Sequence, residues 1–169
     1  MSPILAAMAR IQGMSTETWE KHTNPLSGWT RALILPLVSL VFFYRDVLGD
    51  ATWVLFGALV IWTWVNPRAF PKPKTTDNWM SRAVMGERIW LNRGKVPVPQ
   101  HYSRAIPVIL GIAAAGLPLW GVGLWLQFFW PTMFGLSLCM LAKFWFLDRM
   151  VWLYDDMSHT HPIYREWLY

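Results

Sequence analysis

The sequence predicts an all-α integral membrane protein with four transmembrane helices, arranged as two antiparallel hairpins, and with amphipathic helices on the cytoplasmic side. Apolar residues make up 54% of the 169 residues and charged residues 15%, against about 45–50% and about 25% in soluble domains. Thirteen tryptophans are far more than a soluble core of this size uses. Four apolar stretches complete the pattern, and the chain, residues 1–169, is predicted to form a single membrane domain.

The N-terminal segment, residues 1–31, is predicted to lie on the cytoplasmic surface. Residues 3–12 place their apolar side chains along one helical stripe, which is typical of a short interfacial helix. A further helical turn is expected over residues 15–21, and the HTNP tetrad at 22–25 is expected to end it because proline cannot continue a helix.

Residues 32–65 are predicted to form the first hairpin, from apolar stretches at 32–48 and 51–65. Only Gly49 and Asp50 separate the two stretches, so the turn between them must be tight. A transmembrane helix needs about 20 residues, so both stretches are short. The second, the shorter of the two, needs extension at one end or a thinned bilayer.

The connector, residues 66–104, begins with a proline-rich stretch that cannot be regular helix. A helix is predicted over residues 78–93, with Asp77 as its N-cap. At about 100° per residue, Glu87 lies at the centre of an apolar stripe on this helix. A carboxylate there needs a partner when the stripe is buried. It either pairs with the neighbouring Arg88 or acts as a metal ligand or acid/base group.

Residues 105–147 are predicted to form the second hairpin, from apolar stretches at 105–126 and 128–147 that are both long enough to span a bilayer. Small residues allow transmembrane helices to approach each other closely. Four glycines of the first stretch are candidates for this role: Gly111, Gly116, Gly121 and Gly123.

The last segment, residues 148–169, is predicted to continue the fourth helix into the cytoplasm and to end in a tail. On a continued helix, four residues fall within about 60° of one another: Asp148, Trp152, Asp155 and His159. Asp155 and His159 form an i,i+4 pair, the spacing that a helix offers to a divalent metal. Alternatively, Asp148 and Arg149 simply neutralise each other at the membrane boundary.

The orientation follows from the positive charges. Eight of the fifteen Lys and Arg residues lie between Arg68 and Arg104, whereas the opposite turns carry only Arg45, Asp46 and Asp50. Positive residues mark the cytoplasmic side, so the N-terminus, the connector and the C-terminus are all expected there. The net charge of +5 does not indicate nucleic-acid binding, because the basic residues form no single face.

The polar residues of the cytoplasmic side suggest one candidate site, that of a metal-dependent enzyme acting on a lipid-like or quinone-like substrate. Carboxylates and imidazoles together suit iron or manganese, and arginines suit an anionic headgroup. The catalytic candidates are Glu87, Asp148, Asp155 and Asp156; the metal candidates are His159, Asp155, His22 and His101; the cofactor- or headgroup-binding candidates are Arg68, Arg88, Arg93 and Arg149.

Five stretches resemble a family of small prokaryotic multi-pass membrane proteins known only as a domain of unknown function. They are NPLSGWTR (24–31), WTWVNPRAFP (62–71), NWMSRAVMGERIWLNR (78–93), VPVPQH (96–101) and WFLDRMVWLYDDM (145–157). The resemblance covers roughly residues 19–157. It implies a membrane protein of a prokaryotic cell (inner) membrane and the unity of the chain, and it implies no activity or catalytic residue.

The favoured function is that of a non-catalytic membrane accessory or scaffold protein, with the metal-dependent enzyme as the alternative. Expected partners are membrane lipids and another membrane protein or a second copy of the chain, and not nucleic acid. A transporter or channel is disfavoured because, apart from the turns, Lys143 is the only charged residue in the predicted spans.

Overall fold

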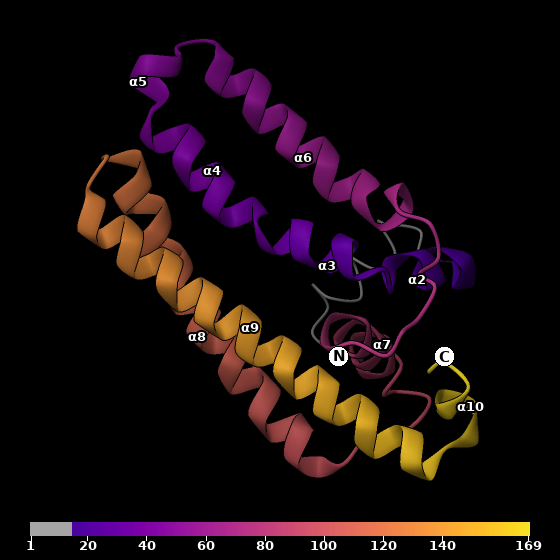
Figure 1. Ribbon diagram of the computed structural model, residues 1–169. Helices are drawn as coiled ribbons and strands as arrows, with labels where there is room; N and C mark the ends of the chain where they lie inside the picture. Colours follow the sequence, from indigo (N-terminus) through magenta and orange to yellow (C-terminus); the bar gives the residue numbers. More distant parts are fainter. Residues whose placement is uncertain (1–14) are drawn as a thin grey trace.

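The computed structural model describes residues 15–169, and the secondary structure of these residues is entirely α-helical (Figure 1). The helix predicted over residues 3–12 lies outside the described residues. The helices are α2 (Thr16–His22), α3 (Pro25–Ala32), α4 (Ile34–Phe43), α5 (Arg45–Leu48), α6 (Ala51–Ala69), α7 (Trp79–Leu91), α8 (Gln100–Trp125), α9 (Phe129–Thr160) and α10 (Pro162–Arg165).

Three helical segments among residues 15–169 are long and apolar enough to cross a membrane, which indicates a membrane protein. They are Pro25–Phe43, formed by α3 and α4, Gln100–Trp125 and Phe129–Thr160. The helix α6 packs beside α4 and, with 19 residues, is as long as the first of these segments, but its mean hydropathy is too low for it to count among them (Figure 1). Asn66, Pro67 and Arg68 in its last turns lower its mean hydropathy. The four predicted spans are therefore three candidate spans and one less apolar helix.

The first candidate span begins earlier than the sequence predicted. The HTNP tetrad does more than end α2, because the side chain of Asn24 accepts a hydrogen bond from the Leu26 amide and Pro25 is the first residue of α3. Both residue types are favoured at these positions of a helix start. The helix is interrupted at Leu33 and α4 ends at Phe43, so the apolar residues near Leu48 belong to the separate short helix α5.

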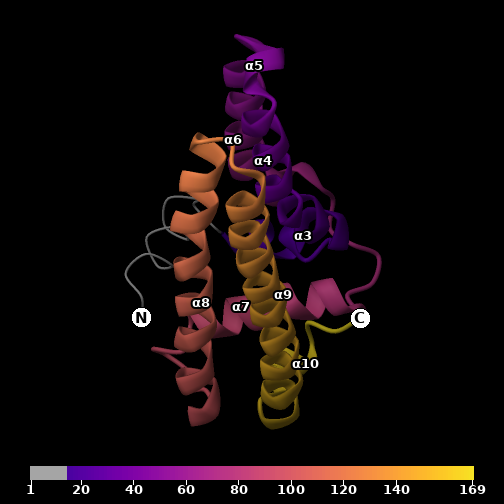
Figure 2. The ribbon, with the colours of Figure 1, turned by 90° about the vertical axis from the view of Figure 1, so that its left-hand side faces the viewer.

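The helices α8 and α9 lie side by side along their length (Figures 1 and 2). Glycines permit this close approach. A Cβ atom on Gly135 would meet the backbone of Trp120, and one on Gly116 would lie 2.9 Å from the Cys139 sulfur. Of the four glycines singled out in the sequence, Gly116 and Gly123 contact α9. The other two, Gly111 and Gly121, have no neighbour among residues 15–169 within 4 Å of such an atom, so the close-approach prediction is wrong for them.

The turns at one end of the molecule are joined by polar contacts. The Arg45 guanidinium donates to the carbonyl oxygens of Leu124 and Trp125 at 2.9 and 2.7 Å, where α8 ends. The Leu124 carbonyl also accepts from the Gln127 amide at 3.3 Å in the turn that follows α8. A cation at a helix C-terminus also stabilises the helix dipole. The amide of Gln127 donates to the Asp46 carboxylate at 2.8 Å.

Replacing Arg45 by methionine is expected to lower the free energy of unfolding by about 1–2 kcal/mol, because the hydrogen bonds from this charged group to the carbonyls of Phe42, Leu124 and Trp125 are lost. Thermal unfolding in mild detergent, followed by tryptophan fluorescence, measures the effect. The exposed Lys74 provides a control, since Lys74→Met removes a charge without removing such contacts. An unchanged midpoint in Arg45→Met would mean that water replaces the guanidinium at these carbonyls without loss.

The helix α7 lies across α9 toward the opposite end of the molecule (Figure 2). It covers a buried cluster that includes Met80, Ile89, Tyr102, Met150 and Tyr154. A Cβ atom on Gly86 would overlap the carbonyl of Met150, so α7 touches the backbone of α9 at this point.

The sequence predicted the start of α7 one residue too early, but it predicted the extent of α9 correctly. The N-cap of α7 is Asn78, whose side chain accepts from the Ser81 amide at 2.9 Å, and not Asp77 as predicted. The continuation of α9 beyond residue 147 is confirmed, since the helix runs to Thr160.

Candidate functional site

The carboxylates of α9 form the candidate site of the sequence analysis, and each has a partner within the chain. Asp148 accepts from the neighbouring Arg149 at 2.7 Å. This is the local neutralisation that the sequence analysis gave as the alternative to a functional role. Both side chains are partly exposed, at 40% and 31%, so the pair contributes little to stability.

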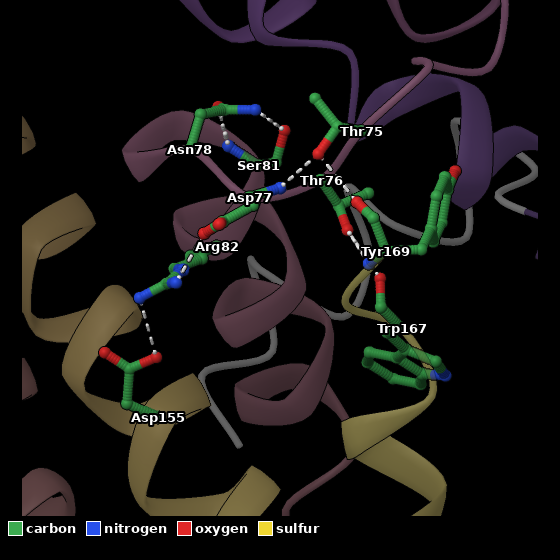
Figure 3. Close-up of polar contacts among 9 residues, drawn as sticks. All are labelled: Thr75, Thr76, Asp77, Asn78, Ser81, Arg82, Asp155, Trp167 and Tyr169. Atoms are coloured by element: carbon green, nitrogen blue, oxygen red, sulfur yellow. Dashed lines mark hydrogen bonds and ion pairs between the residues drawn. The ribbon is translucent and has the colours of Figure 1, made fainter.

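Asp155 is held from the connector. The Arg82 guanidinium lies 3.5 Å from an oxygen of Asp155 and donates to Asp77 at 2.6 Å, so Arg82 links α9 to the start of α7 (Figure 3). Asp155 and Asp156 lie close to the C-terminus of α9, where the helix dipole disfavours negative charge. A partner such as Arg82 offsets this cost.

Asp156 is bound from the start of α8. The Tyr102 hydroxyl donates to its carboxylate at 2.6 Å, and the His101 ring nitrogen lies 4.0 Å from the same oxygen. Tyr102 is 2% exposed, so this hydrogen bond fixes a buried ring at the α8–α9 contact. Of the predicted catalytic carboxylates of α9, Asp155 and Asp156 therefore lie in polar contacts between helices, and Asp148 pairs within its own helix.

The structure does not bring the predicted metal ligands together. Among residues 15–169, no group of three or more His, Cys, Asp or Glu side chains is arranged to hold a metal ion. His159 is exposed near the end of α9, whereas His101 lies at the start of α8 and His22 is buried at the end of α2. An iron or manganese site stays a prediction.

His22 is the centre of a buried polar network that the sequence analysis did not identify. Its Nε2 atom lies 2.8 Å from Arg31 and its Nδ1 atom 2.7 Å from Ser27. Arginine only donates, so Nε2 must accept and the proton lies on Nδ1. Ser27 also bonds to Asn66 at 2.7 Å, and Asn66 bonds to Thr30 at 2.8 Å. The network joins α2, α3 and α6.

The imidazole of His22 is neutral at physiological pH. Burial, aided by the positive charges of Arg31 and Lys143, lowers its pKa from 6.5 to about 3. A neutral ring whose two nitrogens both have partners serves to hold three helices together. In the sequence, the polar tetrad next to a predicted span was the available signal, but Asn66, which bonds to Ser27 in this network, lies 39 residues further along the chain.

The four arginines expected to hold an anionic headgroup share another arrangement, in which each guanidinium lies over a tryptophan ring. The distances to the ring centroids are between 3.9 and 5.1 Å for Arg68 on Trp64, Arg88 on Trp167, Arg93 on Trp90 and Arg149 on Trp152. Cation–π contacts of this kind stabilise each arginine in place. The expected pairing of Glu87 with Arg88 is not present, because Arg88 packs on Trp167.

Two cavities lie beside α7. One, of about 140 Å³, is lined by α2, α7 and the C-terminal residues, with Glu20, Lys72, Arg88 and Glu166 among its walls. Figure 3 shows how Thr75 and Thr76 bond to Trp167 and Tyr169 at its edge. The other, of about 90 Å³, is lined by His22, Arg31, Glu87 and Lys143 together with apolar side chains of α7 and α9.

The fold and the paired charges define a helical protein with candidate membrane spans and a polar surface formed by the connector. The chain belongs to a family of unknown function (DUF6653), which matches residues 3–166. No curated protein and no solved structure matches it. The match confirms the resemblance to an uncharacterised family and extends it beyond residue 157, so His159 and His161 lie within the family's length.

Proposed function

We propose that the protein is a non-catalytic accessory or scaffold protein of a prokaryotic cell membrane. The observation that carries this proposal is the pairing of the α9 carboxylates. Asp148, Asp155 and Asp156 bond to Arg149, Arg82 and Tyr102. Asp148 is neutralised within its own helix, whereas Asp155 and Asp156 take part in contacts that fix α9 against α7 and α8. Each carboxylate therefore has a structural partner that accounts for its charge.

The proposal includes four membrane crossings, with α6 as the fourth. A helix of 19 residues is about 28 Å long, close to the hydrocarbon thickness of about 30 Å. Its packing beside α4 makes the two a natural antiparallel pair, like α8 and α9. The eight positive residues between Arg68 and Arg104 favour a cytoplasmic connector, and with it cytoplasmic N- and C-termini. Its partners would be membrane lipids and another membrane protein or a second copy of the chain.

A double-mutant cycle on Arg82 and Asp155 tests the structural role. Each single change, Arg82→Gln or Asp155→Asn, is expected to lower the free energy of unfolding. In the Arg82→Gln background, Asp155→Asn is expected to cost about 0.5–1 kcal/mol less than in the natural chain, because its partner is already absent and the pair is partly exposed. Thermal unfolding in mild detergent measures the cost of Asp155→Asn in the natural chain and in the Arg82→Gln background.

Metal analysis of the same purified samples provides the opposing outcome. Under the proposal, Asp155→Asn changes stability without changing the metal content or the visible spectrum of the protein. Stoichiometric iron or manganese that is lost in Asp155→Asn would contradict the scaffold and support the enzyme. A strictly additive cycle would show that the Arg82–Asp155 contact does not stabilise the fold.

A further inference from the structure

Lys143 is a charged residue within a candidate membrane span, in α9. It lies four residues before Leu147, about 6 Å along the helix axis from the predicted membrane boundary. Its side chain is only partly exposed and forms no hydrogen bond or ion pair with another of the described residues. Charged groups inside spans are costly, and they usually face a cavity where they meet a partner.

The side chain of Lys143 lines the 90 Å³ cavity between α2, α3, α7 and α9. Arg31 contributes a second cation, and Glu87 lies on the α7 side. Met80, Phe146 and Leu147 supply apolar walls. A cavity of this size holds several water molecules or one small polyatomic group.

The charges of the cavity add up to about +1 at neutral pH. Arg31 and Lys143 each contribute one positive charge and Glu87 one negative charge, while the buried His22 is neutral. The sum counts the described residues that line the cavity. A phosphodiester carries a single negative charge, so it complements the cavity.

Aromatic residues locate the cavity at headgroup depth. Trp29 of α3 is 47% exposed, and its ring lies 6.1 Å from that of Phe144, the neighbour of Lys143, and 6.0 Å from that of Trp79. Amphipathic tryptophan rings prefer the headgroup level of a bilayer. Trp29 at the headgroup level would place the cavity at the depth of the lipid phosphates.

We propose that this cavity binds the phosphate group of an anionic phospholipid, with Arg31 and Lys143 donating to the phosphate oxygens. Arg31 keeps donors for this purpose, because a guanidinium carries five N–H groups and the bond to His22 uses one nitrogen. Glu87 limits the positive charge of the cavity and so weakens the binding of anions. This site is distinct from the four arginines of the sequence analysis and does not depend on the scaffold proposal.

The test is lipid binding by the full chain in mild detergent, with phosphatidylglycerol, phosphatidylcholine and inorganic phosphate as separate probes. Native mass spectrometry counts retained lipids, and thermal unfolding reports stabilisation. Phosphatidylglycerol is expected to bind at least tenfold more weakly to Lys143→Met than to the natural chain, because hydrogen bonds to a charged group are lost. The matched control is Lys95→Met, since Lys95 is exposed on the connector.

Glu87→Gln supplies an effect of opposite sign, because it raises the net charge of the cavity to about +2. It is expected to bind phosphatidylglycerol severalfold more tightly, an outcome that misfolding cannot imitate. Equal binding to the natural chain, Lys143→Met and Glu87→Gln would overturn the proposal. Preference for phosphatidylglycerol over phosphatidylcholine supports an anionic lipid. If inorganic phosphate alone stabilised the natural chain, and Lys143→Met abolished this effect, the cavity would be a site for free phosphate and the lipid proposal would be wrong.

Discussion

Gly86→Ala is expected to destabilise the protein by about 2 kcal/mol or more, although alanine favours helix over glycine by about 1 kcal/mol. The added Cβ atom would overlap the Met150 carbonyl in the backbone of α9. Backbone cannot rotate away as a side chain can, so α7 must move off α9 and open the buried cluster between them. Thermal or denaturant-induced unfolding in mild detergent, followed by tryptophan fluorescence, measures the change.

Gly57→Ala is the matched control. Gly57 lies within α6, and a Cβ atom there would have no neighbour within 4 Å in the part of the chain that the structure describes. The same substitution is therefore expected to leave stability unchanged or raise it by up to about 1 kcal/mol. If Gly86→Ala also raised stability, this result would contradict the close contact between the backbones of α7 and α9.

The second large effect is a pH dependence that originates at His22. Its pKa is about 3 in the folded state, against 6.5 for an unperturbed histidine. Between these two values the unfolded chain binds a proton that the folded chain does not, so acid favours unfolding. The contribution of His22 is fully present above pH 6.5 and is lost as the pH falls. The expected slope approaches 1.4 kcal/mol per pH unit, or about 2 kcal/mol between pH 6.5 and 5.

Unfolding midpoints at pH 7.5, 6.5, 5.5 and 5 measure this slope. His22→Gln keeps a polar side chain but cannot take up a proton, so it is expected to flatten the profile over this range even where it lowers stability overall. His159→Gln is the control, because His159 is exposed, and it is expected to retain the slope of the natural chain. A natural chain whose midpoint does not change down to pH 5 would contradict the buried neutral imidazole.

Local patterns in the sequence predicted the elements that depend on local physics. The apolar stripe over residues 78–93 predicted α7 within a few residues, and the absence of proline before Pro162 predicted the long α9. The start of the first candidate span at Asn24 was missed, because the prediction began the span at the first continuous apolar stretch, near Ala32. The hydropathy of α6 was overestimated because its prediction ended before Asn66 and Arg68.

The site was less predictable, because its contacts join distant elements. Helical spacing placed Asp155 and His159 on one face, but the partner of Asp155 is Arg82, which is 73 residues away and reaches it only because α7 crosses α9. The network around His22 depends in the same way on Asn66 of α6. Lys143 was visible in the sequence as an unusual charge, although its neighbours Arg31 and Glu87 were not.

Accessibility labelling of single cysteines tests most directly whether two helical pairs gather the ionisable groups on one inner surface. Three variants carry one cysteine each, in a chain in which Cys139 is replaced by serine: Val47→Cys, Lys74→Cys and Glu166→Cys. Position 47 lies before α6, position 74 follows α6, and position 166 lies near the end of the chain; all three are exposed. On intact cells, an impermeant maleimide is expected to label position 47 alone, and positions 74 and 166 only after permeabilisation. Labelling of positions 47 and 74 from the same side, or of positions 74 and 166 from opposite sides, would contradict the gathering of the ionisable groups on one inner surface.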